Sequence, residues 1–138
     1  MGAAENKRLM QDIFAEMAKG NGKLFVDSMA DDFRWTIAGA TKWSRTYEGK
    51  QAVITKLLRP LFSQFADTYT ATASRFIAED DYVVVEFGGR STTKTGKPYN
   101  NNYCRIYRIA GGKLQEVTEY LDTELVSAAL ADPDENSL

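Results

Sequence analysis

The sequence predicts an α+β domain in which helices come first and an antiparallel sheet follows. Up to about residue 65 the apolar residues recur at helical spacing, and from Tyr69 onward they alternate with polar ones, as in strands with one buried face. The turn sequences AEDD, TKTGK and AGGK divide the second part into segments that can pair as hairpins. We therefore expect a curved antiparallel sheet made by successive hairpins.

The first part of the chain carries signals for three helices and one strand. Leu9, Ile13, Phe14 and Met17 form an apolar stripe, and KGNGK ends this first helix before a short second one. The segment FRWTIAG then alternates like a strand. A third helix begins within YEGKQAV, and we expect Pro60 to kink it because its ring removes an amide donor.

The second part predicts four strands and a final helix. The strands are expected at about 68–78, 81–92, 98–109 and 113–121. The segment DTELVSAAL follows as a terminal helix, with Asp122 or Thr123 at its N-cap and Glu124 in its first turn. An acid is favoured there by the positive end of the helix dipole.

Length and charge limit the possible partners. The 138 residues predict one domain over residues 1–138, with an ordered core at about 5–130 and an acidic tail at 131–138. Seventeen basic and nineteen acidic residues leave no positive excess for a phosphate backbone, so no nucleic acid is expected. No apolar run exceeds four residues, which predicts no membrane span, and the N-terminus lacks a signal core. We expect a cytoplasmic protein.

The residue types present also limit the chemistry. The chain has no histidine and one cysteine, Cys104, so an internal disulfide, a zinc site and a Cys-His nucleophile are all excluded. We expect no metal and no cofactor. Proton transfer is left to carboxylates, tyrosine, lysine or water.

The segment TEYLDT places two acids three residues apart near the end of the chain. Side chains alternate faces along a strand, so Glu119 and Asp122 would point to opposite sides and cannot form a carboxylate pair. Asp122 is expected to cap the last helix. Glu119 shares its face with Val117 and Leu121, as one acid in an apolar row.

Five motifs, in order, resemble a known group of proteins. MADDFRW, YEGKQAV, GKPYNNNY, AGGKL and TEYLDT are similar to segments of the SnoaL-like branch of the nuclear transport factor 2-like superfamily, over about residues 5–130. That superfamily includes ketosteroid isomerases, limonene-epoxide hydrolases and polyketide cyclases. The resemblance implies a cone-shaped curved sheet with N-terminal helices enclosing an apolar pocket. It also implies a homodimer packed through the outer sheet faces, which an outward row of Val83, Val85 and Phe87 would fit.

The catalytic residues of the characterised relatives are not preserved. The ketosteroid isomerase positions correspond to Ile13, Ile37 and Tyr103, which cannot supply the tyrosine and the two aspartates of that reaction. The Asp-Arg-Asp set of the epoxide hydrolases corresponds to Glu86, Gly88 and Glu119, of which only the last is conservative. Its supporting tyrosine and asparagine correspond to Trp35 and Ile37.

The same alignment selects candidate site residues. Glu119, Glu86 and Tyr103 are the catalytic candidates, and the ligand-pocket candidates are Trp35, Ile37, Asn101, Arg105, Val117 and Leu121. Burial in an apolar wall can raise the pKa of a glutamate by up to about 3 to 5 units, which would suit an acid/base. If Arg105 instead pairs with Glu119 or Glu86, the result is a buried ion pair that holds the sheet or a ligand.

Two classes of function stay open. One is a cofactor-independent isomerase, cyclase or lyase that acts on a small hydrophobic carbonyl or polyketide-like substrate with Glu119 as acid/base. The other is a non-catalytic domain that binds a small hydrophobic molecule with the same residues. The fold alone does not choose between them, because one scaffold hosts both.

Overall fold

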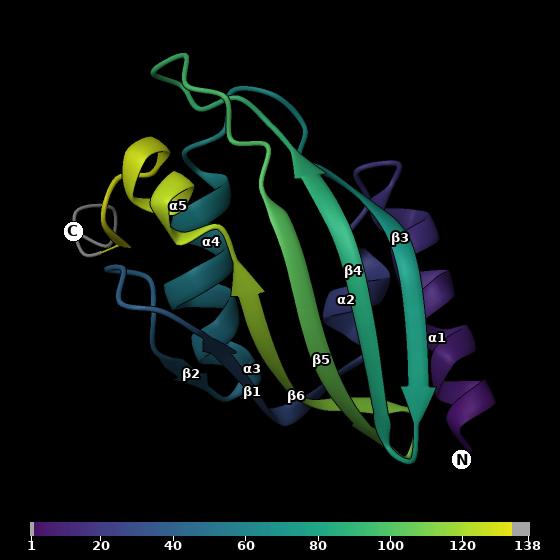
Figure 1. Ribbon diagram of the computed structural model, residues 1–138. Coiled ribbons are helices and arrows are strands. Elements are labelled where there is room, and N and C mark those ends of the chain that lie inside the picture. The colour runs from purple at the N-terminus through teal and green to yellow at the C-terminus, as the bar shows by residue number, and fades with distance from the viewer. Residues whose placement is uncertain (1, 134–138) are drawn as a thin grey trace.

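The computed structural model describes residues 2–133 and contains one six-stranded sheet with the main helices on one side of it (Figure 1). The helices are α1 (Ala3–Met17), α2 (Lys23–Asp27), α3 (Lys50–Ala52), the π-helix η1 (Val53–Leu58), α4 (Arg59–Phe62) and α5 (Thr123–Ala129). The strands are β1 (Met29–Ile37), β2 (Thr46–Glu48), β3 (Thr70–Glu79), β4 (Tyr82–Arg90), β5 (Asn102–Ala110) and β6 (Lys113–Leu121). The expected α+β class is confirmed. Residues 134–138 of the expected tail lie outside the described part.

The strands lie in the order β2-β1-β6-β5-β4-β3 and form a curved, open sheet (Figure 1). All neighbours pair antiparallel except β1 and β6, which are parallel. Tight turns join β3 to β4 and β5 to β6, as the sequence predicts. The short β2, at the edge of the sheet, was not predicted.

None of the helices within residues 2–133 is long and apolar enough to cross a membrane.

Helix α1 closes one side of the cone because its apolar stripe faces the sheet. Ile13 is fully buried, and the ring of Phe14 lies 4.8 Å from that of Phe87 and 5.9 Å from that of Phe76. These rings join α1 to β3 and β4, so a helix distant in sequence is held by aromatic contacts with the sheet.

The third predicted helix changes its hydrogen-bond pattern next to Pro60. The π-helix η1 occupies Val53–Leu58, and α4 begins at Arg59. Proline has no amide hydrogen to donate, and π-helical turns occur where the regular ladder is interrupted. The disturbance expected at Pro60 therefore takes the form of a π-helical segment, which buries Val53 and Leu57.

The last helix begins as predicted. Asp122 Oδ1 accepts a hydrogen bond from the Leu125 amide at 3.2 Å, so Asp122 is the N-cap of α5. Glu119 lies on the other face of β6, buried at 3% exposure. The two acids of TEYLDT thus have separate positions, as the alternation predicts.

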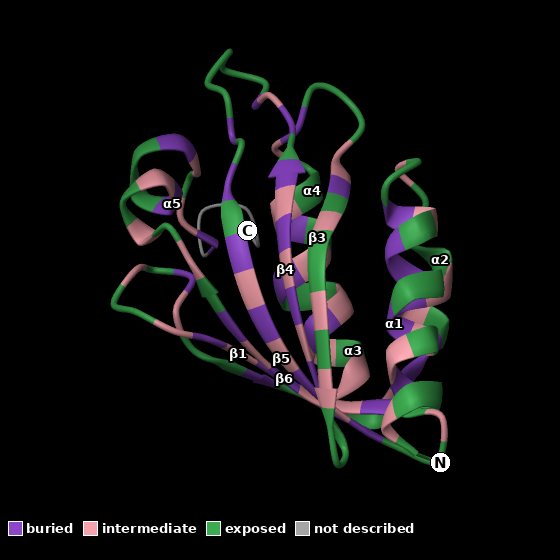
Figure 2. Cartoon of the chain, turned by 45° about the vertical axis from the view of Figure 1, so that its right-hand side comes forward, coloured by how far each residue is buried: buried purple, intermediate pink, exposed green. Residues whose placement is uncertain are grey.

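The expected orientation of β4 is wrong. Val83, Val85 and Phe87 are buried in the core, whereas Glu86 and Gly88 point to the outer face. Register explains this: Val85 pairs with the inward Arg105, and Glu86 pairs with Cys104, whose side chain points outward. Burying the more apolar face also removes more apolar surface from water. Figure 2 shows the resulting alternation of buried and more exposed positions along β4.

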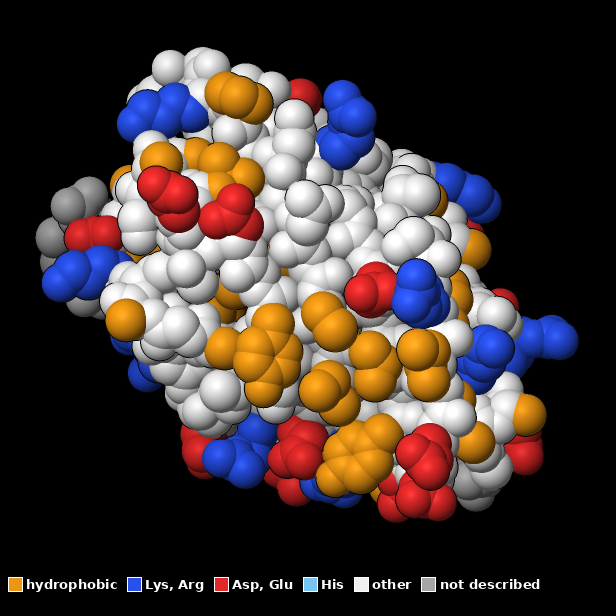
Figure 3. Space-filling model, in the orientation of Figure 1, with side chains coloured by type: hydrophobic (Ala, Val, Ile, Leu, Met, Phe, Trp, Pro, Cys, Tyr) orange, Lys and Arg blue, Asp and Glu red, His pale blue; other side chains and the backbone are white. Residues whose placement is uncertain are grey.

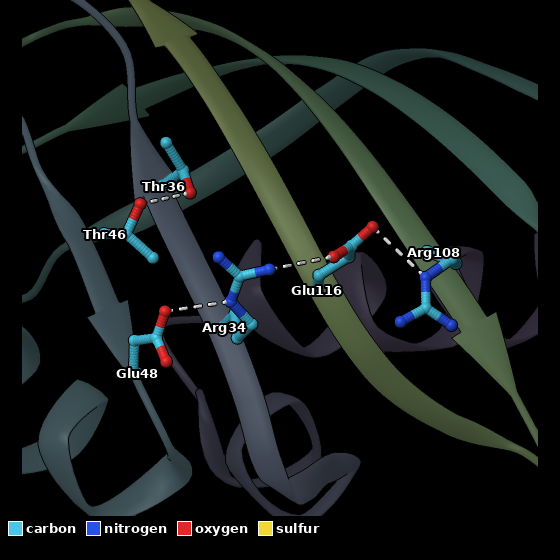
Figure 4. A network of polar contacts seen from close by, with 6 residues as sticks. All are labelled: Arg34, Thr36, Thr46, Glu48, Arg108 and Glu116. Carbon is cyan, nitrogen blue, oxygen red and sulfur yellow. Dashed lines mark hydrogen bonds and ion pairs between the residues drawn. The ribbon is translucent and has the colours of Figure 1, made fainter.

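The outer face of the sheet has an apolar centre beside charged pairs. Ile77, Tyr82, Val84, Ile106 and Tyr120 form what we call the outer patch, and Figure 3 shows hydrophobic side chains gathered on this face. At one end of this face, Arg34 pairs with Glu48 and Glu116, and Glu116 also binds Arg108 (Figure 4). Arg75 and Glu86 form a further pair, 3.0 Å apart.

A glycine on the inner face of β4 makes room for Tyr69. A Cβ placed on Gly89 would lie 2.2 Å from the Tyr69 hydroxyl oxygen and 2.7 Å from its ring carbon Cζ. A Cβ on the neighbouring Gly88 would meet nothing closer than the Asn102 side chain at 3.7 Å. The position of the Tyr69 phenol therefore depends on the missing side chain at residue 89.

Gly89→Ala should destabilise the protein by about 1–3 kcal/mol, because the added methyl group overpacks against Tyr69. The free energy of unfolding in urea measures the effect. Gly88→Ala is the matched control and should change it far less. Equal effects of the two substitutions would contradict the assigned position of Tyr69.

Candidate functional site

A cavity of about 520 Å³ lies between the inner face of the sheet and the helices. Six sequence-predicted residues line it: Trp35, Ile37, Tyr103, Arg105, Glu119 and Leu121. The other three do not. Val117 is buried without lining the cavity, Asn101 lies behind the wall, and Glu86 is on the opposite face of the sheet.

The helices and loops supply most of the remaining lining. Lining residues that the sequence analysis did not select include Phe25, Trp43, Leu57, Phe62, Tyr69, Phe87, Tyr99, Val126 and Leu130. Leu57 lies in η1, within the third predicted helix; an apolar side chain on a helix predicts burial, but it does not predict which residues lie beside it. Phe25 and Trp43 come from α2 and from the loop after β1, whose positions depend on tertiary packing.

Arg105 and Glu119 form a buried ion pair in the cavity wall. They are directly opposite each other on β5 and β6, and Arg105 Nε lies 2.5 Å from Glu119 Oε2. The two side chains are only 9% and 4% exposed. The pairing that was one alternative for Glu119 is therefore present, and it leaves no net charge at this point of the wall.

The guanidinium of Arg105 is enclosed by aromatic rings. Its central carbon lies 4.5 Å from the ring centre of Trp35 and 4.7 Å from that of Phe87. Nη1 donates to the Tyr107 hydroxyl at 2.9 Å. Burial by itself would lower the pKa of Arg105, but the charge of Glu119, with the phenols of Tyr107 and Tyr69, outweighs it and raises the pKa above its ordinary value. Arg105 is therefore a permanent cation.

Three phenols contribute further polar groups. Tyr69, Tyr99 and Tyr103 line the cavity, and burial is the main cause that raises the pKa of each above its ordinary value. Their hydroxyls are close enough for Tyr103 to influence the pKa of both others. A neutral phenol both donates and accepts hydrogen bonds, so this part of the wall can bind an oxygen atom without supplying a charge.

Asn101 fixes the wall from behind. Its Nδ2 donates to the Tyr99 hydroxyl and to the Asp122 carbonyl, both at 3.1 Å. Its Oδ1 accepts from the Asp122 amide at 3.0 Å. Asn101 is 1% exposed, so it connects Tyr99 to the start of α5 and has no access to a ligand.

One buried donor in the wall is unused. Trp35 Nε1 has no hydrogen-bond partner among the described residues, although Trp35 is only 3% exposed and lines the cavity. An unsatisfied buried donor costs about 1–3 kcal/mol.

Within residues 2–133, no three His, Cys, Asp or Glu side chains are grouped so that they could hold a metal ion.

Arg105→Met should destabilise the protein by about 3–5 kcal/mol, because Glu119 would remain buried without its partner. Adding Glu119→Gln to that variant removes the uncompensated charge and should recover part of the loss. Urea unfolding of the single and double variants measures the coupling. Additive effects would show that the two side chains do not stabilise each other.

Comparisons with known proteins agree with this architecture. The family model for the SnoaL-like domain matches residues 10–117. No curated protein matches the chain. A nuclear transport factor 2-like protein from Burkholderia xenovorans LB400 is 23% identical, with a TM-score of 0.71 over 95% of this chain and 99% of that chain.

Two further solved structures carry functional names. A candidate SnoaL-like polyketide cyclase from Jannaschia sp. CCS1 is 17% identical, with a TM-score of 0.76 over 92% of each chain. A candidate isomerase from Bacillus subtilis is 21% identical, with a TM-score of 0.72 over 94% of this chain and 95% of that chain. At these identities the likeness shows the fold alone. The family model spans well over half of the sequence, and the chain therefore belongs to the SnoaL-like domain family.

Proposed function

We propose that the protein binds a small, largely apolar molecule that carries one or two oxygen atoms. The observation that supports this most directly is the cavity itself, which is apolar on most sides and polar along one wall. Its volume of about 520 Å³ falls within the range of about 300–1,000 Å³ that is typical of ligand pockets. Aromatic and aliphatic side chains would bind the body of the ligand.

The polar wall favours a neutral acceptor such as a carbonyl group. Arg105 is already paired with Glu119, so an anionic ligand would find no unpaired positive charge at this wall; the other cations among the lining residues, Lys23 and Arg59, come from the helical side. The Tyr69 and Tyr103 hydroxyls are neutral donors that can bind a carbonyl oxygen.

The catalytic form of this proposal is a cofactor-independent isomerase, cyclase or lyase. Glu119 is the one acid among the described residues that line the cavity. Its carboxylate would remove a proton from the carbon beside the carbonyl group and return that proton to the substrate, while Tyr103 donates to the oxygen that becomes negative. The names of the Jannaschia and Bacillus subtilis neighbours support this class of reaction. Glu86 has no part in it, because it lies on the outer face.

The alternative is ligand binding without catalysis. The observation that favours it is the short contact between Arg105 and Glu119, which gives the carboxylate a structural partner. In that case the ion pair shapes the wall and the phenols recognise the ligand oxygen.

Binding can be measured through the two tryptophans, Trp35 and Trp43, which both line the cavity. Titration with 9-fluorenone should change their fluorescence, whereas fluorene, which lacks the oxygen, and fluorene-9-carboxylate, which carries a charge, should bind at least about tenfold more weakly. Tyr103→Phe should remove the preference for fluorenone over fluorene. No binding of fluorenone would contradict the proposed ligand class.

Catalysis can be measured by proton exchange without knowledge of the substrate. The wild-type protein should accelerate exchange of the acidic protons of 2-tetralone with D₂O, followed by NMR, and Glu119→Gln should lose this by about 10²–10⁴-fold. Glu116→Gln, which changes an acid on the outer face, is the control. If the wild-type protein binds fluorenone but exchanges the protons of 2-tetralone no faster than buffer alone, the catalytic form of the proposal is wrong and the non-catalytic alternative holds.

We also propose a homodimer that buries the outer patch. Ile77 and Tyr120 are 52% and 50% exposed, and no helix within residues 2–133 covers this face in Figure 1. Isolated apolar residues are normal on a surface, but a group on one sheet face marks an interaction site. The row that we expected to face outward, Val83, Val85 and Phe87, cannot contribute because it is buried in the core.

Sedimentation equilibrium tests this dimer. The wild-type protein should have twice the chain mass of 15.4 kDa, and Tyr120→Lys should shift it towards the monomer by placing a charge in the patch. Ala15→Lys, at an exposed position of α1, is the control. A monomeric wild-type protein would overturn the proposal.

A further inference from the structure

We infer that α5 and residues 130–133 form a movable cover over one side of the cavity, and that Gln64 is its latch. The inference concerns access to the same site and rests on the proposed function for its importance to a ligand. Val126 and Leu130 of this segment line the cavity.

The end of the cover is held by side chains from two other parts of the cavity rim. The Ala131 amide donates to Gln64 Oε1 at 2.8 Å, and Gln64 Nε2 donates back to the Ala131 carbonyl at 3.4 Å. Trp43 Nε1 donates to the same carbonyl at 3.0 Å. Gln64 follows α4, and Trp43 lies in the loop after β1, so these bonds close the cover across the cavity.

The start of the cover is held differently. Asn101 binds both the amide and the carbonyl of Asp122 and is itself buried in the protein. The Gln64 bonds to Ala131 are instead exposed to solvent, so water can replace them when they break. At Asp122 both bonds come from a buried side chain, whereas at Ala131 the Gln64 pair is exposed and only the Trp43 bond is shielded, so Ala131 is the end that can move.

Helix α5 offers little resistance to such a movement. It has only seven residues, too few to be stable alone, and of these only Val126 and Ala129 are buried. Segments that bury few apolar side chains and rely on solvent-exposed hydrogen bonds open at low free-energy cost. In addition to the Gln64 latch, Lys97 Nζ donates a hydrogen bond to the Ala128 carbonyl of α5 at 3.1 Å.

The two tryptophans report the opening directly. Trp35 and Trp43 are the only tryptophans in the sequence, both line the cavity, and they are 3% and 4% exposed. Because both side chains are almost inaccessible to solvent with the cover in place, acrylamide quenching should increase when the cover moves away. Gln64→Ala should therefore raise the Stern–Volmer quenching constant by at least about twofold, because the latch bonds are lost. Gln115→Ala is the matched control, since Gln115 also binds a backbone carbonyl but lies in β6 beside the β5–β6 turn, and it should leave quenching unchanged.

Circular dichroism during thermal unfolding shows that each variant is folded at the temperature of the measurement. If Gln64→Ala does not fold, Trp43→Phe removes the other latch donor, and quenching of Trp35 alone should rise. Unchanged quenching in a folded latch variant would overturn the inference. The measurement needs no ligand, so it separates failure of the latch from failure of the proposed function. Where 9-fluorenone binds, stopped-flow fluorescence should show association and dissociation accelerated by the same factor, with Kd unchanged.

Discussion

The buried ion pair between Arg105 and Glu119 is the constraint on which the inside of the cone depends. Two charges on neighbouring strands can be buried in an apolar core only when they compensate each other and their remaining polar atoms find partners. Tyr107 supplies one partner, and the rings of Trp35 and Phe87 enclose the guanidinium. The pair fixes the polar side of the cavity and leaves it without net charge.

The wall beside that pair depends on a few specific contacts between β4, the loop before β5 and the phenols. Gly89 leaves room for the Tyr69 phenol, and Asn101 holds Tyr99 from behind the wall. The result is a set of neutral donors next to a compensated charge pair, surrounded by apolar side chains. Such a wall recognises an oxygen atom by hydrogen bonding, which is a different chemistry from anion capture.

The same sheet separates three tasks. The cavity and the buried ion pair lie on its inner face. The outer patch and the exposed ion pairs of Arg34 and Glu116 lie on its outer face. Its strand β6 continues through Asp122 into the cover. Exposed pairs contribute little to stability because water screens them, whereas the buried pair cannot lose one partner without a large cost. Glu116 and Glu119, three residues apart, therefore have very different roles.

Helical spacing, alternation and turn chemistry by themselves determined the main helices, the hairpins, the Asp122 cap and the separation of Glu119 from Asp122. These are local properties, set by spacing along the chain. The inward face of β4, the partner of Glu119 and the cavity lining from Phe25, Trp43 and Leu130 were decided by the tertiary structure. Period two gives a strand two faces, but only its register against β5 shows that Val85 lies beside Arg105 and that Glu86 faces outward.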